Sequence, residues 1–231
     1  MRRLLLLALL FPMLAHAQDK PAKRTCRILF LNPPADAPKK LYLFDGVASH
    51  EIQMPEMNFS DVYQLAGGDT TLRLLPAPVV KAEEIPAGAP SGKLAESVVD
   101  LYLVASSDPA NKVVPVRFQI IDASAMKFRQ GQMMWYNLTN LAVGGKLGSQ
   151  KLAMKGQSRV VTEAPTSGPE SYDVELSYQI PGDPQFHPIS QTKWVHDPRS
   201  RMVMFIYGGN DNSVPQISGF KDFRDAPAKT E

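Results

Sequence analysis

Proline and glycine interrupt this sequence at short intervals. It contains 20 prolines and 15 glycines, and the runs between them are short and rich in Val, Ile, Leu, Tyr and Phe. β-Branched and aromatic residues favour strands, whereas proline and glycine favour turns. No window of about 12 residues has a clean 3.6-residue apolar period, so long helices are not expected. The sequence predicts an all-β, Ig-like antiparallel sandwich, built either as one domain or as two sandwich subdomains.

The N-terminus has the features of a secretory signal peptide. Arg2 and Arg3 precede an apolar run at residues 4–14, and Ala15-His16-Ala17 supplies a small-x-small cleavage signal. The run is shorter than the roughly 20 residues of a membrane-spanning helix. We therefore expect cleavage near Ala17, giving a secreted or periplasmic mature chain with no membrane span. The alternative is an uncleaved N-terminal anchor.

Charge and cysteine content exclude several classes of protein. The formal net charge is +2, and two of the basic residues belong to the predicted leader, so the mature chain is near neutral. A nucleic-acid binder would concentrate Lys and Arg on one face, and no such partner is expected. The chain has one cysteine, Cys26, which excludes an intramolecular disulfide. We expect Cys26 to be buried as a small apolar residue, with pairing between chains as the alternative.

The strand candidates fall into two groups separated by a connection rich in proline, alanine and glycine. This pattern predicts an N-terminal sandwich part at residues 26–80, a connection at 81–96, a C-terminal sandwich part at 97–223 and a disordered tail at 224–231. The predicted strands are residues 27–32, 41–44, 51–54, 61–65, 70–75, 98–105, 113–121, 133–137, 143–147, 151–154, 159–162, 173–180, 191–195, 202–207 and 216–220.

A weak internal repeat accompanies these groups. The segment ILFLN at residues 28–32 is similar to MMWYN at residues 133–137, and each is followed by two short strands and a longer alternating one. An apolar strand that ends in asparagine also arises by chance, so the repeat indicates either a duplication or a coincidence of strand composition.

The start of the first group resembles a known family. The segments RILFLNPPADAP at residues 27–38 and LYLFDG at residues 41–46 resemble the opening of a family of secreted bacterial β-sandwich domains of unknown function. That opening is an apolar strand, a Pro-Asp-Ala-Pro loop and a strand ending in Asp-Gly. This chain departs from the pattern in its loop, where Ala35 separates Pro34 from Asp36. The resemblance covers residues 27–75 and implies a sandwich fold and export, with no catalytic residues.

No motif predicts a catalytic site. The Gly-x-Ser-x-Gly elbow of serine hydrolases is missing from the sequence. His187, His196 and Asp197 could form a metal or hydrolase site if the loops around residues 191–195 folded together. The alternative is that both histidines lie in exposed turns, since His196-Asp197-Pro198-Arg199 has the composition of a turn.

Aromatic residues are the better candidates for binding. Trp135 and Tyr136 are adjacent in a predicted strand and face opposite ways, so we expect one buried and one exposed ring. Trp194 and His196 complete the predicted binding residues. We therefore expect a non-catalytic protein, without cofactor or metal, that binds an unknown protein or cell-envelope ligand or has a structural role in the envelope. The alternatives are a hydrolase or metal-dependent enzyme and a subunit that docks through an edge strand.

Overall fold

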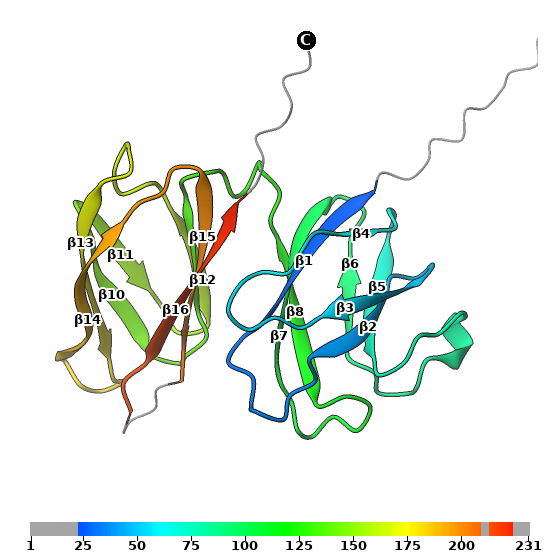
Figure 1. Cartoon of the computed structure of the whole chain (residues 1–231). Helices are drawn as coiled ribbons and strands as arrows, with labels where there is room; N and C mark the ends of the chain where they lie inside the picture. The colour runs from blue at the N-terminus through cyan, green and yellow to red at the C-terminus, as the bar shows by residue number, and fades with distance from the viewer. Residues whose placement is uncertain (1–22, 209–212, 224–231) are drawn as a thin grey trace, which may run out of the picture.

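The computed structural model of the chain describes residues 23–208 and 213–223 (Figure 1). The expected signal peptide at residues 1–17 and the expected tail at residues 224–231 lie outside the described residues. Strands dominate the described part, and its only helical element is a short 3-10 turn at Ala82–Glu84. The predicted all-β sandwich-like fold is confirmed.

The first eight strands form the N-terminal sandwich. They are β1 (Arg24–Phe30), β2 (Lys40–Phe44), β3 (Ser49–Gln53), β4 (Tyr63–Leu65), β5 (Thr70–Leu75), β6 (Ser91–Leu94), β7 (Asp100–Ser107) and β8 (Val116–Asp122). Its inner sheet has the order β4-β1-β7-β8, and its outer sheet has the order β3-β2-β5-β6. Ile28 and Leu103 of the inner sheet pack against Leu43 and Leu72 of the outer sheet in one apolar core.

The remaining eight strands form the C-terminal sandwich. They are β9 (Met133–Asn137), β10 (Ala142–Leu147), β11 (Gln150–Met154), β12 (Ser158–Thr162), β13 (Ser171–Gln179), β14 (Phe186–Val195), β15 (Ser200–Tyr207) and β16 (Gln216–Phe223). Its inner sheet has the order β12-β9-β15-β16, and its outer sheet has the order β11-β10-β13-β14. Trp135 and Ile206 of the inner sheet share a core with Val143 and Leu176 of the outer sheet.

The two sandwiches have the same topology. Strands β1 to β8 correspond in order to β9 to β16, and the sheet orders match position by position. Each inner sheet contains one parallel pair, β1 with β7 and β9 with β15. The sequence predicted purely antiparallel pairing, and this part of the prediction is wrong. The repeat noted between residues 28–32 and 133–137 falls on the equivalent strands β1 and β9. The similarity of these two segments therefore extends to the order of all eight strands in each sandwich.

The predicted boundary between the halves is misplaced. Strands β7 and β8 lie beyond residue 97, yet β7 pairs with β1 and β8 pairs with β7 in the N-terminal sandwich. The connection expected at residues 81–96 also contains β6, an edge strand paired with β5. Proline and glycine mark where the chain turns at the surface, but they do not specify which strands pair afterwards. The chain passes between the sandwiches after β8, at residues 123–132.

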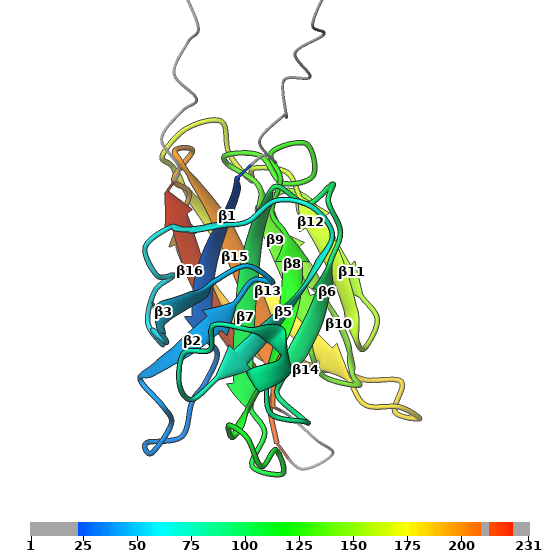
Figure 2. The ribbon, with the colours of Figure 1, turned by 90° about the vertical axis from the view of Figure 1, so that its right-hand side faces the viewer.

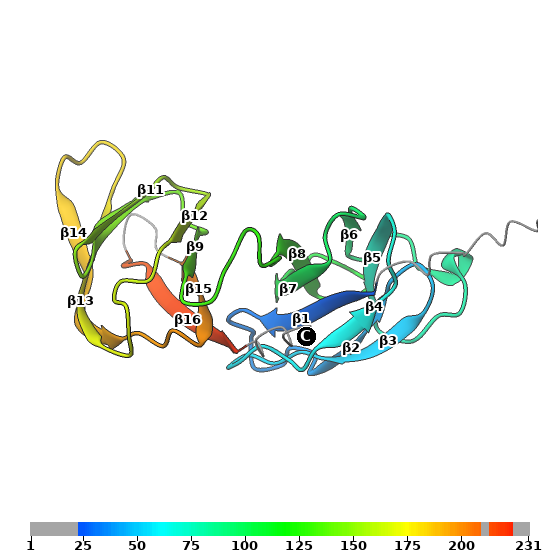
Figure 3. The ribbon, with the colours of Figure 1, turned by 90° about the horizontal axis from the view of Figure 1, so that it is seen from above.

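A central core joins the sandwiches. The two inner sheets face each other between the outer ones when the molecule is seen from above (Figure 3), and Figure 2 shows the N-terminal sandwich in front of the C-terminal one. Leu29 of β1 and Tyr102 of β7 share this core with Phe205 of β15, whereas Ile28 faces the N-terminal core. Because side chains alternate along a strand, both faces of the inner strands are buried.

This arrangement corrects the prediction for Trp135 and Tyr136. Trp135 is fully buried and Tyr136 is only 8% exposed, so neither ring is the exposed one that was expected. Trp135 faces the C-terminal core and Tyr136 faces the central core. Alternation placed the two rings on opposite faces correctly, but the outward face of β9 is covered by the other sandwich. Tyr136 therefore does not present a ligand-binding surface.

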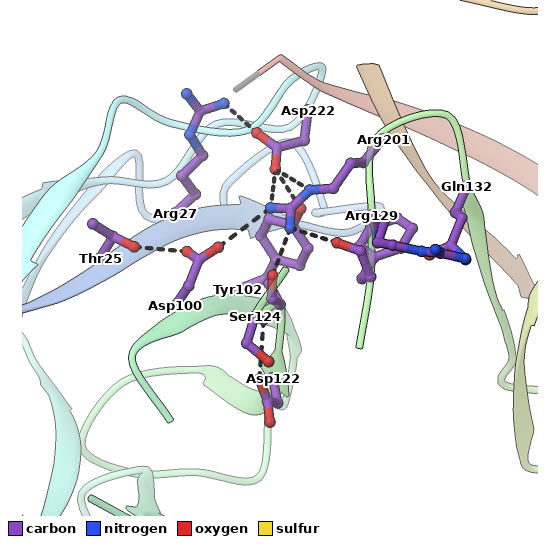
Figure 4. Close-up of polar contacts among 12 residues, drawn as sticks. Thr25, Arg27, Asp100, Tyr102, Asp122, Ser124, Arg129, Gln132, Arg201 and Asp222 are labelled. Carbon is purple, nitrogen blue, oxygen red and sulfur yellow. Dashed lines mark hydrogen bonds and ion pairs between the residues drawn. The ribbon is translucent and has the colours of Figure 1, made fainter. Parts of the chain in front are cut away.

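A buried polar cluster lies within the central core (Figure 4). Arg201 of β15 donates from Nη2 to Asp222 of β16 at 2.6 Å and from Nη1 to the carbonyl of Ala123 at 2.5 Å. Arg27 of β1 donates to the other oxygen of Asp222 at 2.6 Å, and the Tyr102 hydroxyl also donates to Asp222. Residues of both sandwiches thus share one carboxylate.

Asp100 connects the same cluster to the start of β1. Its carboxylate accepts hydrogen bonds from the Thr25 hydroxyl at 2.7 Å and from Arg201 at 3.4 Å. The guanidinium of Arg201 also lies over the ring of Phe128, 5.0 Å from its centroid. Buried charges are stable only when they are paired and hydrogen-bonded, and such networks constrain how their elements are oriented. The cluster therefore fixes the orientation of the two inner sheets as well as their contact.

Candidate binding groove

The two sandwiches differ at one seam, by which we mean the place where the last strand of the inner sheet meets the last strand of the outer sheet. In the N-terminal sandwich the edges β6 and β8 close together, since a Cβ added to Gly92 would lie 2.9 Å from the Phe118 ring and 3.0 Å from Ile120. The equivalent edges of the C-terminal sandwich, β14 and β16, border a groove of about 890 Å³. The seam is therefore closed in the N-terminal sandwich and open in the C-terminal one, and the open seam forms the groove.

Apolar side chains from four strands line the groove. Trp194 comes from β14, Tyr172 from β13, Met204 from β15 and Ile217 from β16. Gly219 of β16 completes this surface, and a Cβ there would lie 2.7 Å from the sulfur of Met204. Glycine in a strand often marks a close approach by another group, here the thioether of Met204. Methionine is flexible and polarizable, so this lining can adapt to ligands of different shape.

Trp194 is held in place by two other rings. Its indole stacks on that of Trp135, with centroids 6.1 Å apart and planes 13° apart, and the ring of Tyr172 meets it edge-on at 6.4 Å. Trp135 is anchored beneath it by a hydrogen bond from Nε1 to the Thr162 hydroxyl at 3.3 Å. Burial raises the pKa of Tyr172 to about 12, so its hydroxyl stays neutral. The result is a fixed, partly exposed indole, suited to an apolar or aromatic ligand.

The groove carries little charge. Lys193 alone is charged among the described residues that line it, and its ammonium lies 2.9 Å from the Asp173 carboxylate on the exposed face of the outer sheet. The hydroxyls of Tyr172 and Tyr207 and the side chains of serine and glutamine supply the remaining polar groups. An uncharged ligand fits this lining, because an ionised group would lose its hydration without gaining a partner.

The structure separates the residues of the alternative metal or hydrolase site. His187 lies near the start of β14 and His196 directly follows its end, so about nine strand residues, or about 30 Å, separate them. His187 is bound to Asp183 at 2.9 Å, and the Asp197 carboxylate accepts hydrogen bonds from Arg199. The predicted loops do not converge, because β14 is five residues longer at its start than the predicted strand at residues 191–195.

His196 itself is buried behind one end of the groove. Its backbone N–H donates to the carbonyl of Glu170 at 3.0 Å, while its Nε2 has no hydrogen-bond partner among the described residues. Burial lowers the pKa of its imidazole, and the neighbouring Asp197 offsets this only in part. Within residues 23–208 and 213–223, no group of three His, Cys, Asp or Glu side chains could hold a metal ion.

Of the four predicted binding residues, only Trp194 lines the groove. Trp135 supports it from below, Tyr136 lies in the central core and His196 is buried at the end of β14. Sequence reasoning missed Tyr172, Met204, Ile217 and Gly219, because their convergence depends on two sheet edges staying apart. Gly219, inside the strand predicted at residues 216–220, was the available signal for the site, since a glycine within a strand often marks close approach by another group.

No protein-family model matches the chain, and no curated protein matches it either. In the part of the chain that the structure describes, no helix is long and apolar enough to cross a membrane.

Proposed function

We propose that this chain is an exported, non-catalytic protein of immunoglobulin-like type that binds an uncharged, apolar ligand in the groove between β14 and β16. The observation that carries the proposal is the open seam lined by Trp194 and Met204, where the equivalent seam of the other sandwich is shut. The leader-like N-terminus and the resemblance to secreted bacterial β-sandwich domains support a place outside the cytoplasm, in the cell envelope or the medium.

The chemistry of the groove supports binding rather than catalysis. General acid–base catalysis needs a titratable pair within hydrogen-bond reach of a bound substrate. The one charged side chain among the described lining residues, Lys193, is already paired with Asp173. The separation of His187 from His196 also argues against the alternative hydrolase or metal site at His187, His196 and Asp197.

The tryptophans provide a direct test of the binding site. The chain has two, Trp135 and Trp194, and they stack on each other at the groove. We expect the uncharged dye N-phenyl-1-naphthylamine to quench their emission in the purified mature chain. Trp194→Ala should weaken dye binding about tenfold, since aromatic anchors dominate such sites.

Phe186→Ala is the matched control. Phe186 is also an aromatic residue of β14 and is 60% exposed, but it does not line this groove. Dye binding should be unchanged in this variant. Equal affinities of Trp194→Ala and the unaltered chain, measured by dye fluorescence, would contradict the proposed site.

A further inference from the structure

The strand β16 has a hollow on each of its two faces. As the last strand in the order β12-β9-β15-β16, it leaves one edge without a neighbouring strand among residues 23–208 and 213–223. The binding groove of about 890 Å³ lies on one side, and a second hollow of about 330 Å³ lies on the other. Tyr207, Ser218 and Gly219 line both hollows, so the two meet at this edge.

The alternation of β16 places the hollows on opposite faces of the inner sheet. Ile217 packs against the C-terminal core, on the side of the binding groove, whereas Phe220 belongs to the central core between the sandwiches. The second hollow continues from that interface. Pro33 and Met57 of the N-terminal sandwich form its far wall, and Met57 is 78% exposed.

An extended polypeptide matches this geometry. Side chains of a β-strand point alternately to the two faces of its sheet, while its backbone amides pair with a free sheet edge. We propose that the ligand is an extended polypeptide segment that adds to β16 as a fifth strand and places successive apolar side chains alternately in the two hollows. Gly219 is exposed at this edge and lines both hollows. The inference rests on the proposed binding function and specifies its ligand.

The closed seam of the N-terminal sandwich indicates the side chains that the segment should carry. There Phe118 and Ile120 of β8 pack around Gly92 of β6. The hollows of β16 are also nearly uncharged: Lys193 and Glu56 are their charged described residues, and both are ion-paired, with Asp173 and Lys39 respectively. The expected partner is therefore a neutral segment in which aromatic residues alternate with branched aliphatic ones.

A second copy of the chain fits this edge less well. If two β16 strands paired about a two-fold axis, each would present Ile217, Gly219 and Lys221 on the groove side, because these residues share a face. Lys221 would enter the apolar groove and lose its contact with Asp197, which lies 4.0 Å away. Burial of an unpaired ammonium is costly.

The test uses a capped neutral peptide of about nine residues in which phenylalanine alternates with valine, so that each hollow receives apolar side chains. We expect it to bind the mature chain and change the emission of Trp194. Two further peptides carry N-methyl groups on one or the other alternate set of amides. Strand addition uses one set only, so one methylated peptide should bind at least tenfold more weakly and the other should bind like the parent.

Binding of both methylated peptides with the parent affinity would overturn strand addition, because the hollows would then accept apolar groups without backbone pairing. Failure of the parent peptide in a chain that still binds N-phenyl-1-naphthylamine would also overturn it, while leaving the proposed groove in place. Failure of the dye and the peptide together would instead reject the proposed function. These outcomes separate the two proposals.

A protein variant tests the second hollow independently. Met57→Glu places a charge there on an exposed loop residue, so the variant should fold normally. Peptide affinity should fall about tenfold while dye affinity stays unchanged. Met126→Glu, at a residue that is 96% exposed and lines neither hollow, is the control. Unchanged peptide affinity in Met57→Glu would overturn the proposal. A dimer of the unaltered chain that dissociates when peptide is added would also overturn it, because a second copy would then occupy the edge of β16.

Discussion

Nη2 of Arg201 lies 2.6 Å from Oδ2 of Asp222 in the core between the two sandwiches, where the side chain of Asp222 is fully buried and that of Arg201 is 3% exposed. The pair joins adjacent strands, but Arg27 and Tyr102 of the N-terminal sandwich bind the same carboxylate. Forming such a pair gains little net free energy, because both ions lose their hydration. Removing one partner is costly, because the other charge remains buried.

Arg201→Met should therefore destabilise the chain strongly. The expected loss in the free energy of unfolding is about 3–5 kcal/mol, since Asp222 loses one of its two bound cations, the more deeply buried one, and the carbonyl of Ala123 loses a donor. Urea-induced unfolding followed by tryptophan emission measures this loss. Lys193→Met is the control: it breaks a pair whose side chains are 73% and 71% exposed, and it should cost less than about 1 kcal/mol. Similar losses in both variants would contradict a structural role for the buried pair.

Two adjacent glycines of β10 should respond very differently to substitution. A Cβ added to Gly145 would lie 1.9 Å from the carbonyl oxygen of Glu175, whereas one added to Gly144 would meet nothing closer than 3.5 Å. The Glu175 carbonyl belongs to the paired strand β13 and cannot move without disturbing the sheet. Gly145→Ala should lower the free energy of unfolding by about 3 kcal/mol, and Gly144→Ala should change it by less than about 1 kcal/mol. Thermal unfolding of the two variants provides the comparison.

Local sequence patterns predicted most of the strands but not how they assemble. Residues 70–75 and 133–137 were predicted with the bounds that β5 and β9 have, since alternation and flanking turn residues are local signals. The strand β6 was missed, because Ser91 and Gly92 have low strand propensity and its edge position is set by pairing with β5. The strands β1 and β7 are far apart in the sequence of the N-terminal sandwich, so no local sequence pattern indicates that they pair.

The site was harder to predict than the fold. Trp194 was selected for its chemistry, and the structure places it in the groove. Tyr136 was selected by the same reasoning and is covered, because a second sandwich packs on its sheet. Whether an aromatic side chain on a strand is exposed depends on the neighbouring layer, which neither strand propensity nor alternation specifies. The groove itself arises from a difference between two repeats, and only their comparison in space reveals it.

The carboxylate of Asp45 should make the stability of the N-terminal sandwich dependent on acid pH. Burial disfavours its charge, but hydrogen bonds from the amides of Ala48, Ala66 and Val47 and from His50 outweigh this effect and hold its pKa below the usual 3.8. Because the pKa is lower in the folded chain, the ionised carboxylate stabilises the fold above about pH 4. This contribution is lost as the pH falls through the folded-state pKa.

Asp45→Asn should therefore lower the free energy of unfolding by about 1–3 kcal/mol at neutral pH, and the difference from the unaltered chain should shrink below about pH 4. Urea unfolding at a series of pH values measures both effects. Asp61→Asn, at an exposed residue, should cost little at any of these pH values. A difference for Asp45→Asn that stays constant across the series would show that the ionised carboxylate is not responsible.

His196 should produce a second pH dependence, at higher pH. Burial lowers the pKa of its imidazole in the folded chain, so the unfolded chain takes up a proton more readily. Stability should therefore fall as the pH decreases through the unfolded value of about 6.5 and towards the folded-state pKa.

His196→Phe keeps a planar ring and cannot be protonated, so the slope of stability against pH between about 7 and 5 should become flatter. An unchanged slope in His196→Phe would assign the pH dependence to another group. Since Tyr172 and Met202 line both the small cavity at His196 and the groove, dye binding at each pH would also show whether protonation there reaches the binding site.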